Sequence, residues 1–99
     1  MKTQKISKIF KALGHPTRIK IIEYLLEINS CYCGNIVNIF PYSQSTISQH
    51  LKRLKESGIV RGEIEGPKTC YCIDKGTFDE LKEYVANLKY GVTGVTKDE

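Results

Sequence analysis

The four cysteines of this 99-residue chain form two Cys-Tyr-Cys tripeptides, one at Cys31 and Cys33 and the other at Cys70 and Cys72. Residues two apart on a β-strand point to the same face of the sheet. If the tripeptides pair as antiparallel strands, with 31 opposite 72 and 33 opposite 70, all four sulfurs share one face. Four thiolates would then suit a tetrahedral soft metal such as zinc, and three would suit arsenite.

Two other interpretations of the cysteines stay open. Directly opposed cysteines could oxidise to cross-strand disulfides if their Cα separation is suitable. They could also be buried packing residues, because a free cysteine behaves as a small hydrophobe. Spacing alone does not fix thiol reactivity, so metal or metalloid ligation, redox sensing and packing all remain possible.

A second chemical pattern lies in the segment 43–57, which has the periodicity of a helix. Ser43 can cap its first turn, and Ile47, Leu51 and Leu54 form a narrow apolar stripe. Its remaining face is polar and free of acids in the first turns, and cations follow. We expect this face to contact DNA through Gln44, Ser45, Thr46, Ser48, Gln49, Lys52, Arg53 and Lys55.

These side-chain types suit double-stranded DNA. Gln makes bidentate contacts with adenine, Ser and Thr are permissive hydrogen-bonding partners, and cations near the end of the helix favour phosphates. Helix capping explains Ser43 but not the whole polar face. His50 is open, because it could reach DNA or fill space beside Leu51 and Leu54.

The surrounding elements would position these residues as two helices followed by a hairpin. Helices are predicted over 3–13 and over 35–40. Another helix is predicted from His15-Pro16-Thr17 to about 28, with an apolar stripe of Ile19, Ile22, Leu25 and Leu26. The last helix is predicted to start at Thr77, because Thr77 and Glu80 have capping-box spacing. A short strand is expected at 30–34, and a hairpin at 59–65 and 69–74, with 70–72 in its outer strand. Lys68 at the hairpin tip could touch DNA or be an ordinary solvated turn residue.

Composition and charge narrow the classes of function. Residues 1–55 carry nine Lys and Arg against two Glu, whereas residues 56–99 carry six against nine Asp and Glu. This asymmetry indicates a polyanionic partner. No acid–base pair, nucleophile–base pair or phosphate loop is apparent, so an enzyme is not expected. The two histidines, His15 and His50, are expected to lie far apart.

The segments FKALGHPTR (10–18), SQSTISQHLKRL (43–54) and KESGIV (55–60) closely resemble the ArsR/SmtB family of dimeric repressors. The resemblance implies a winged-helix homodimer joined through its first and last helices, which binds its operator without an effector and is released by an inducer. The pair Cys31 and Cys33 resembles the Cys-x-Cys motif of thiolate sensors of arsenite, antimonite, cadmium or lead. The third cysteine common in arsenite sensors is Ile36 here, and the last helix lacks the histidines of the family's zinc and nickel sites.

The sequence therefore predicts a mainly α winged helix-turn-helix with a small β-hairpin wing. Residues 1–90 would form one DNA-binding and dimerisation domain, and 91–99 a polar, frayed tail. The expected function is that of a cytoplasmic homodimeric repressor of operator DNA, with no cofactor needed for DNA binding and no membrane contact. Release would follow thiol oxidation or binding of zinc, arsenite or cadmium. The alternative is a thiol-based metal-binding or redox protein whose helix-turn-helix contacts another macromolecule.

Overall fold

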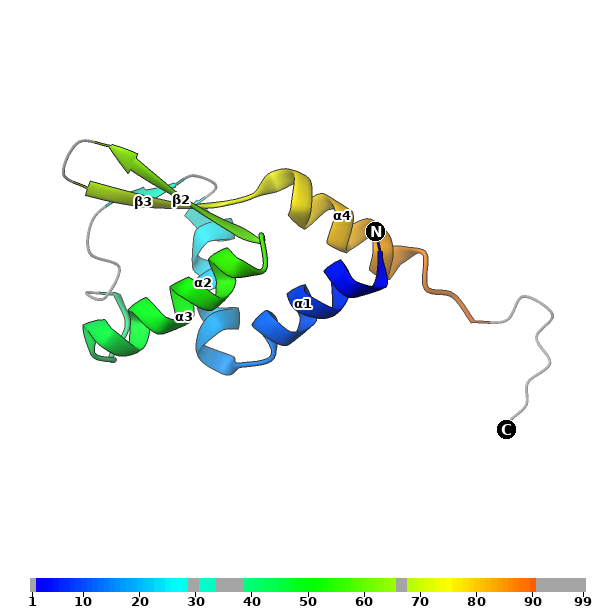
Figure 1. Cartoon of the computed structure of the whole chain (residues 1–99), viewed down its shortest axis with the longest axis horizontal. Helices are drawn as coiled ribbons and strands as arrows, with labels where there is room; N and C mark the ends of the chain where they lie inside the picture. The colour runs from blue at the N-terminus through cyan, green and yellow to red at the C-terminus, as the bar shows by residue number, and fades with distance from the viewer. Residues whose placement is uncertain (1, 29–30, 34–38, 66–67, 91–99) are drawn as a thin grey trace.

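The computed structural model describes residues 2–28, 31–33, 39–65 and 68–90. Helices cover one face of a small antiparallel sheet, and the last helix extends away from it (Figure 1). In chain order the elements are α1 (Thr3–Leu13), α2 (Pro16–Ile28), β1 (Tyr32–Cys33), α3 (Gln44–Glu56), β2 (Val60–Glu65), β3 (Lys68–Ile73) and α4 (Lys75–Ala86). Among these residues no helix is long and apolar enough to cross a membrane.

The first two helices form where the apolar periodicity predicts them, but α2 turns a different face to the core. Its buried apolar residues are Ile21, Ile22 and Leu25, whereas Ile19 and Leu26 are 45% and 38% exposed. The predicted stripe was therefore wrong at those two positions. Because residues four apart lie on one side of a helix, packing on Ile21 and Leu25 turns Ile19 outward.

The sheet has the strand order β1-β3-β2, so β3 is its central strand. The sequence placed 70–72 in the outer strand of the hairpin. This strand is β3, and β1 adds to its free edge, so that Tyr32 pairs with Tyr71 and Cys33 with Cys70, as the expected antiparallel pairing of the two tripeptides requires. On its other edge β3 pairs with β2, from Val60 opposite Ile73 to Glu65 opposite Lys68.

The inner face of α3 is fully buried, as predicted. Ile47, Leu51 and Leu54 join one hydrophobic core with residues of α1, α2 and the sheet. The helix is followed by Gly58, whose φ of 88° lies in the left-handed region that glycine adopts at low cost. The chain thereby reverses directly into β2, so only a short turn separates α3 from the hairpin.

The last helix begins two residues before its predicted start. Asp74, rather than Thr77, is the cap, because its carboxylate accepts the backbone N–H of Thr77 at 2.9 Å. The predicted Thr77 and Glu80 capping box was therefore wrong. The side chain of Glu80 instead accepts a hydrogen bond from Lys5 Nζ of α1 at 2.8 Å, which lowers the pKa of Glu80.

Two predictions fall on parts of the chain that the structure does not describe. Residues 34–38 of the predicted short helix 35–40 lie outside the described residues, as does the tail 91–99. The described residues 39–42 form no α-helix and lead directly into the cap of α3.

Candidate nucleic-acid interface

The N-terminal turns of α3 are exposed. Ser43 caps the start of the helix, and several polar side chains next to it have no hydrogen-bond partner among the described residues. Ser43 Oγ accepts the backbone N–H of Thr46 at 3.3 Å and donates to Thr46 Oγ1 at 2.9 Å, and it also lies 3.3 Å from Ser45 Oγ. These hydroxyls are thus partly used within the cap. Gln44, Ser48 and Gln49 are exposed, and their side chains have no hydrogen-bond partner within the described part of the chain.

The outermost line of α3 follows from the helical repeat of 3.6 residues. Positions separated by four, three and four residues stack along one side, opposite the buried Ile47 and Leu54. This line consists of Ser45, Gln49, Lys52 and Glu56. The acid-free surface therefore extends over the first three turns and ends at Glu56.

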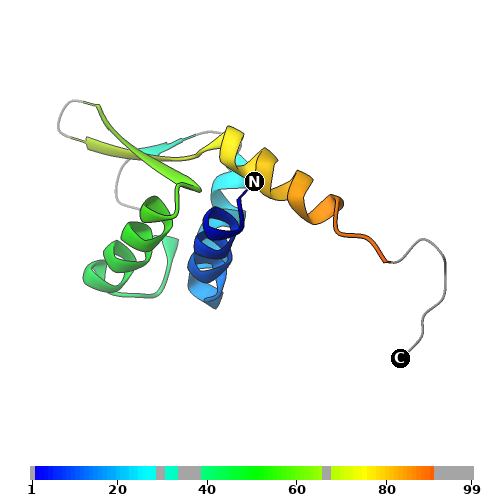
Figure 2. The ribbon, with the colours of Figure 1, turned by 45° about the vertical axis from the view of Figure 1, so that its right-hand side comes forward.

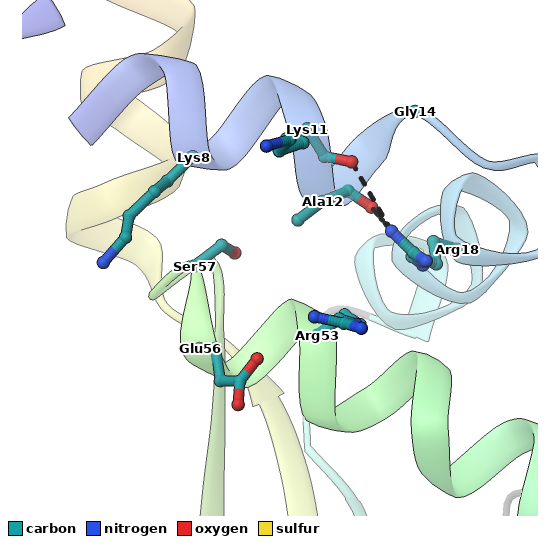
Figure 3. A pocket seen from close by; sticks show the side chains of 8 residues that line it. All are labelled: Lys8, Lys11, Ala12, Gly14, Arg18, Arg53, Glu56 and Ser57. Atoms are coloured by element: carbon teal, nitrogen blue, oxygen red, sulfur yellow. Dashed lines mark hydrogen bonds between the residues drawn. The ribbon is translucent and has the colours of Figure 1, made fainter. Parts of the chain in front are cut away.

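The three cations predicted to follow the polar face point in different directions. Lys52 lies on the outer line, whereas Lys55 lies against the wing, where a Cβ added at Gly62 would be 2.9 Å from Lys55 Cε and Nζ. Arg53 faces α1 and lines a cleft of about 780 Å³ (Figure 3). The residues of this basic cleft are Lys8, Lys11, Ala12, Gly14, Arg18, Arg53, Glu56 and Ser57.

His50 lies on the inner edge of α3, where it meets the turn between α1 and α2. Its ring centroid is 4.5 Å from that of His15, so the prediction that the two histidines lie far apart was wrong. Its Nδ1 accepts a hydrogen bond from Arg18 Nε at 3.2 Å. Burial first, and then the charges of His15 and Arg18, lower the pKa of His50. This geometry supports the packing interpretation of His50.

This contact was not predictable from spacing, because helix packing brings the two histidines together from distant parts of the sequence. His15 also fixes the start of α2, since its Nδ1 accepts the backbone N–H of Thr17 at 3.1 Å. Both rings therefore use Nδ1 as an acceptor, which places each ring proton on Nε2 in the neutral form. The pair connects the start of α2 directly to α3.

The cysteines occupy the register that the duplicated tripeptides predict. Cys31 and Cys72 form a disulfide with a Cα–Cα distance of 4.2 Å, and Cys33 lies opposite Cys70 in the ladder. The side chain of Cys33 lies outside the described residues. Cys70 and Cys72 are 3% and 2% exposed and are therefore buried.

The opposite face of β1 carries the aromatic contacts. Tyr32 packs edge-on against Tyr24 of α2 at a centroid distance of 5.8 Å, and Tyr24 contacts Phe40 at 6.3 Å. Tyr71 and Ile73 of β3 likewise face the core. The strand before the helix-turn-helix is thus held by α2 on one face and by the wing, through a covalent bond, on the other.

The cysteine face has the donors for a soft metal only in its reduced form. The disulfide uses the sulfurs of Cys31 and Cys72, and thiolates rather than disulfides bind metals. Within the described residues no group of three or more His, Cys, Asp or Glu side chains is arranged to hold a metal ion. Reduction would free the sulfurs of Cys31 and Cys72 and that of Cys70, which is also disulfide-bonded, and thiolates on one face fit a thiophilic cation.

The wing tip is partly described. Lys68 is the first residue of β3 and pairs with Glu65, rather than forming part of the turn itself. Its side chain and residues 66–67 lie outside the described part of the chain. DNA contact by Lys68 therefore stays a prediction.

Known proteins resemble this chain in sequence and fold. The family model described as "Bacterial regulatory protein, arsR family" matches residues 15–61. An uncharacterized HTH-type transcriptional regulator of Methanocaldococcus jannaschii is 41% identical over 87 residues, covering 88% of this chain and 98% of that protein. The cadmium resistance transcriptional regulatory protein CadC of Listeria innocua is 35% identical, covering 88% of this chain and 73% of CadC.

A solved structure extends the resemblance to the fold. It is the homodimeric winged helix-turn-helix DNA-binding domain of a possible ArsR-family regulator from Mycobacterium bovis, which is 24% identical. The two superpose with a TM-score of 0.67 over 89% of this chain and 85% of that one. The fold is a winged helix-turn-helix, and the sequence relatives are transcriptional regulators rather than enzymes. The chain belongs to the ArsR family of regulatory proteins.

Proposed function

We propose that the protein is a homodimeric transcriptional repressor that reads double-stranded operator DNA with α3. The observation that carries the proposal is the arrangement of this helix. Its inner face is fully buried and fixed, while Ser45, Gln49 and Lys52 form an exposed outer line. A rigid helix with an acid-free polar face suits the major groove, where the N-terminal turns of a recognition helix meet base edges.

The contacts divide into those that read sequence and those that bind the backbone. Gln44, Ser48 and Gln49 retain the hydrogen-bonding groups for base edges, and Ser45 and Thr46 lie beside them at the helix start. Lys52 on the outer line suits a phosphate, as do Arg53 and Lys55 on its two flanks and Lys68 near the wing tip.

The exposed apolar surface of α1 and α4 supports the homodimer. Val85 of α4 and Leu88, two residues beyond its end, are 49% and 61% exposed, and Phe10 of α1 is exposed beside Tyr84 at a centroid distance of 6.4 Å. Figure 2 shows α4 extending away from α2 and α3. A second copy of the same surface would bury these side chains, and the Mycobacterium bovis domain is a homodimer.

Thiol chemistry on the β1–β3 pair supplies the proposed control of DNA affinity. Oxidation of Cys31 and Cys72 transfers two electrons and two protons to an oxidant and joins the segment before the helix-turn-helix to the wing. Reduction would release this link and expose thiolates to a thiophilic metal. CadC, named for cadmium resistance, supports the metal branch, and the disulfide between Cys31 and Cys72 means that these two sulfurs lie close enough to react with each other.

The DNA-binding proposal is tested by fluorescence anisotropy with the chain's own upstream DNA and a scrambled duplex. Gln44→Ala should weaken specific binding far more than binding to the scrambled duplex, because base contacts carry the sequence information. Lys52→Gln should weaken both similarly. A specificity ratio that Gln44→Ala leaves unchanged would place the reading face elsewhere.

Thiol control is tested by comparing the DNA affinities of reduced, oxidised and cadmium-loaded protein. A variant with all four cysteines replaced by serine is the control. Oxidation or loading should weaken DNA binding several-fold or more in the wild type alone, since couplings between sites typically amount to about 1–3 kcal/mol. Equal affinities in all four folded samples would reduce the cysteines to structural residues.

A further inference from the structure

The basic cleft between α1 and the C-terminal end of α3 is separate from the polar outer line of the recognition helix. Lys8 and Lys11 come from α1, Arg18 from α2 and Arg53 from α3. Figure 3 shows Lys8 and Arg53 on opposite walls and Arg18 near the α1–α2 turn. A second hollow of about 700 Å³ adjoins it, sharing Lys8, Glu56 and Ser57 and extending to Lys2 and Lys5.

The charges in the basic cleft are not neutralised within the subunit. Four cations face one carboxylate, that of Glu56, and none of these five side chains forms an ion pair with any described residue. Like charges held around one cavity repel each other. An anion inside the cleft would relieve that repulsion.

Arg18 is held in place before any ligand arrives. Its Nε donates to His50 Nδ1 at 3.2 Å, and its Nη1 donates to the carbonyl oxygens of Ala12 at 3.1 Å and Lys11 at 3.4 Å. The partly buried guanidinium therefore has a fixed position, and its Nη2 remains available for another acceptor. A pre-positioned guanidinium loses less conformational entropy on binding than a mobile lysine does.

The cleft stays accessible in the proposed dimer. Lys8 and Phe10 are two positions apart on α1, which separates their side chains by about 200° around the helix. Phe10 and Tyr84 lie on the flank toward α4, whereas Lys8 faces α3. A second copy packed on the apolar flank would leave the basic flank open to solvent.

We propose that the basic cleft binds a phosphate group through Lys8, Arg18 and Arg53. Guanidinium groups match the geometry of phosphate oxygens, and lysine adds a point charge. The phosphate could belong to the DNA backbone beside the recognition helix or to a free phosphorylated ligand. The DNA case rests on the proposed function, and the free-ligand case does not.

The test uses full-length protein and a double variant, Lys8→Ser with Arg53→Gln. Its matched control is Lys20→Ser with Lys75→Gln, which removes two exposed cations from α2 and α4 outside the cleft. In one arm inorganic pyrophosphate is titrated at constant ionic strength, with amide chemical shifts as the readout. In the other arm the affinity for upstream DNA is measured over a range of salt concentrations.

A free-ligand site would show saturable shifts at the cleft that weaken at least tenfold in the double variant and persist in the control. A backbone contact in the cleft would instead lower the salt slope of the double variant below that of Arg53→Gln alone, by about 0.9 for each further phosphate no longer neutralised, with no such change in the control. If neither effect occurs in a double variant with a folded spectrum, the proposal is wrong. Failure of the wild type to bind DNA would refute the proposed function, while the pyrophosphate arm would still decide the free-ligand case.

Discussion

Helices α3 and α4 carry similar apolar stripes but are held in different ways. The stripe of α3 lies entirely in the core through Ile47, Leu51 and Leu54. In α4 one residue, Leu81, is buried, with 8% of its surface exposed, while Val85 is half exposed. An apolar stripe in the sequence therefore does not indicate whether the subunit itself buries it or leaves it exposed. The subunit itself positions α3, whereas α4 leaves exposed the apolar surface that we propose a second copy covers.

Leu54→Ala should have the largest effect on stability. Removing a fully buried leucine loses its transfer free energy and leaves a cavity, so the free energy of unfolding should fall by about 2–5 kcal/mol. Urea denaturation of the oxidised protein measures this loss. Val85→Ala on the exposed side of α4 is the control, and its subunit should unfold within about 0.5 kcal/mol of wild type at protein concentrations where both are monomeric. Equal losses would contradict the difference between the two helices.

Val85→Lys should weaken self-association while leaving the subunit folded. A lysine in an apolar interface must be desolvated without a partner, so we expect the dimer dissociation constant to rise at least tenfold, equivalent to about 1.4 kcal/mol. Analytical ultracentrifugation measures this constant. Ala86→Lys adds the same charge about 100° around α4 from Val85, one turn after the exposed Lys82, and its dissociation constant should remain near that of wild type. A similar increase in both variants would remove Val85 from the interface.

Patterns within single elements predicted much of this structure. The period of 3.6 residues placed the inner face of α3, and the period of two in the duplicated tripeptides predicted that Cys31 lies opposite Cys72. Asp74 and Thr77 are both good capping residues only three positions apart, so local chemistry did not decide between them. The tertiary packing did, because Asp74 directly follows β3 and its backbone N–H bonds to Ile59.

The parts that sequence did not predict depend on contacts between elements. His15 meets His50 because the α1–α2 turn packs against the middle of α3. Arg53 separates from Lys52 because each successive residue turns by about 100° around the helix. Counting cations along the sequence therefore could not distinguish Lys52, which lies on the outer line of α3, from Arg53, which lines the basic cleft.

Asp74→Ala tests how firmly α4 is joined to the subunit. Losing the cap should lower the free energy of unfolding by about 1 kcal/mol, whereas Asp74→Asn should retain most of it. The hydrogen bond from the backbone of Thr77 lowers the pKa of Asp74. The cap's contribution is therefore complete above the unfolded-state pKa of about 3.9 and is lost as the pH falls through the folded-state value. Urea denaturation at pH values above and below this range measures both effects, and an Asn variant as unstable as the Ala variant would contradict the capping role.

His50 should give the smallest effect, and it tests the polar contact that joins α3 to α2. Because burial, His15 and Arg18 lower its pKa, the unfolded chain binds a proton more readily than the folded one. Its contribution to stability is then complete above the unfolded-state pKa of about 6.5 and declines as the pH falls below that value. In His50→Gln, the free energy of unfolding should vary less between about pH 7.5 and 5.5, because the amide oxygen can accept from Arg18 without titrating. Urea denaturation across this range measures the free energy of unfolding of both proteins. Identical pH profiles would show that protonation of His50 does not affect stability where α2 meets α3.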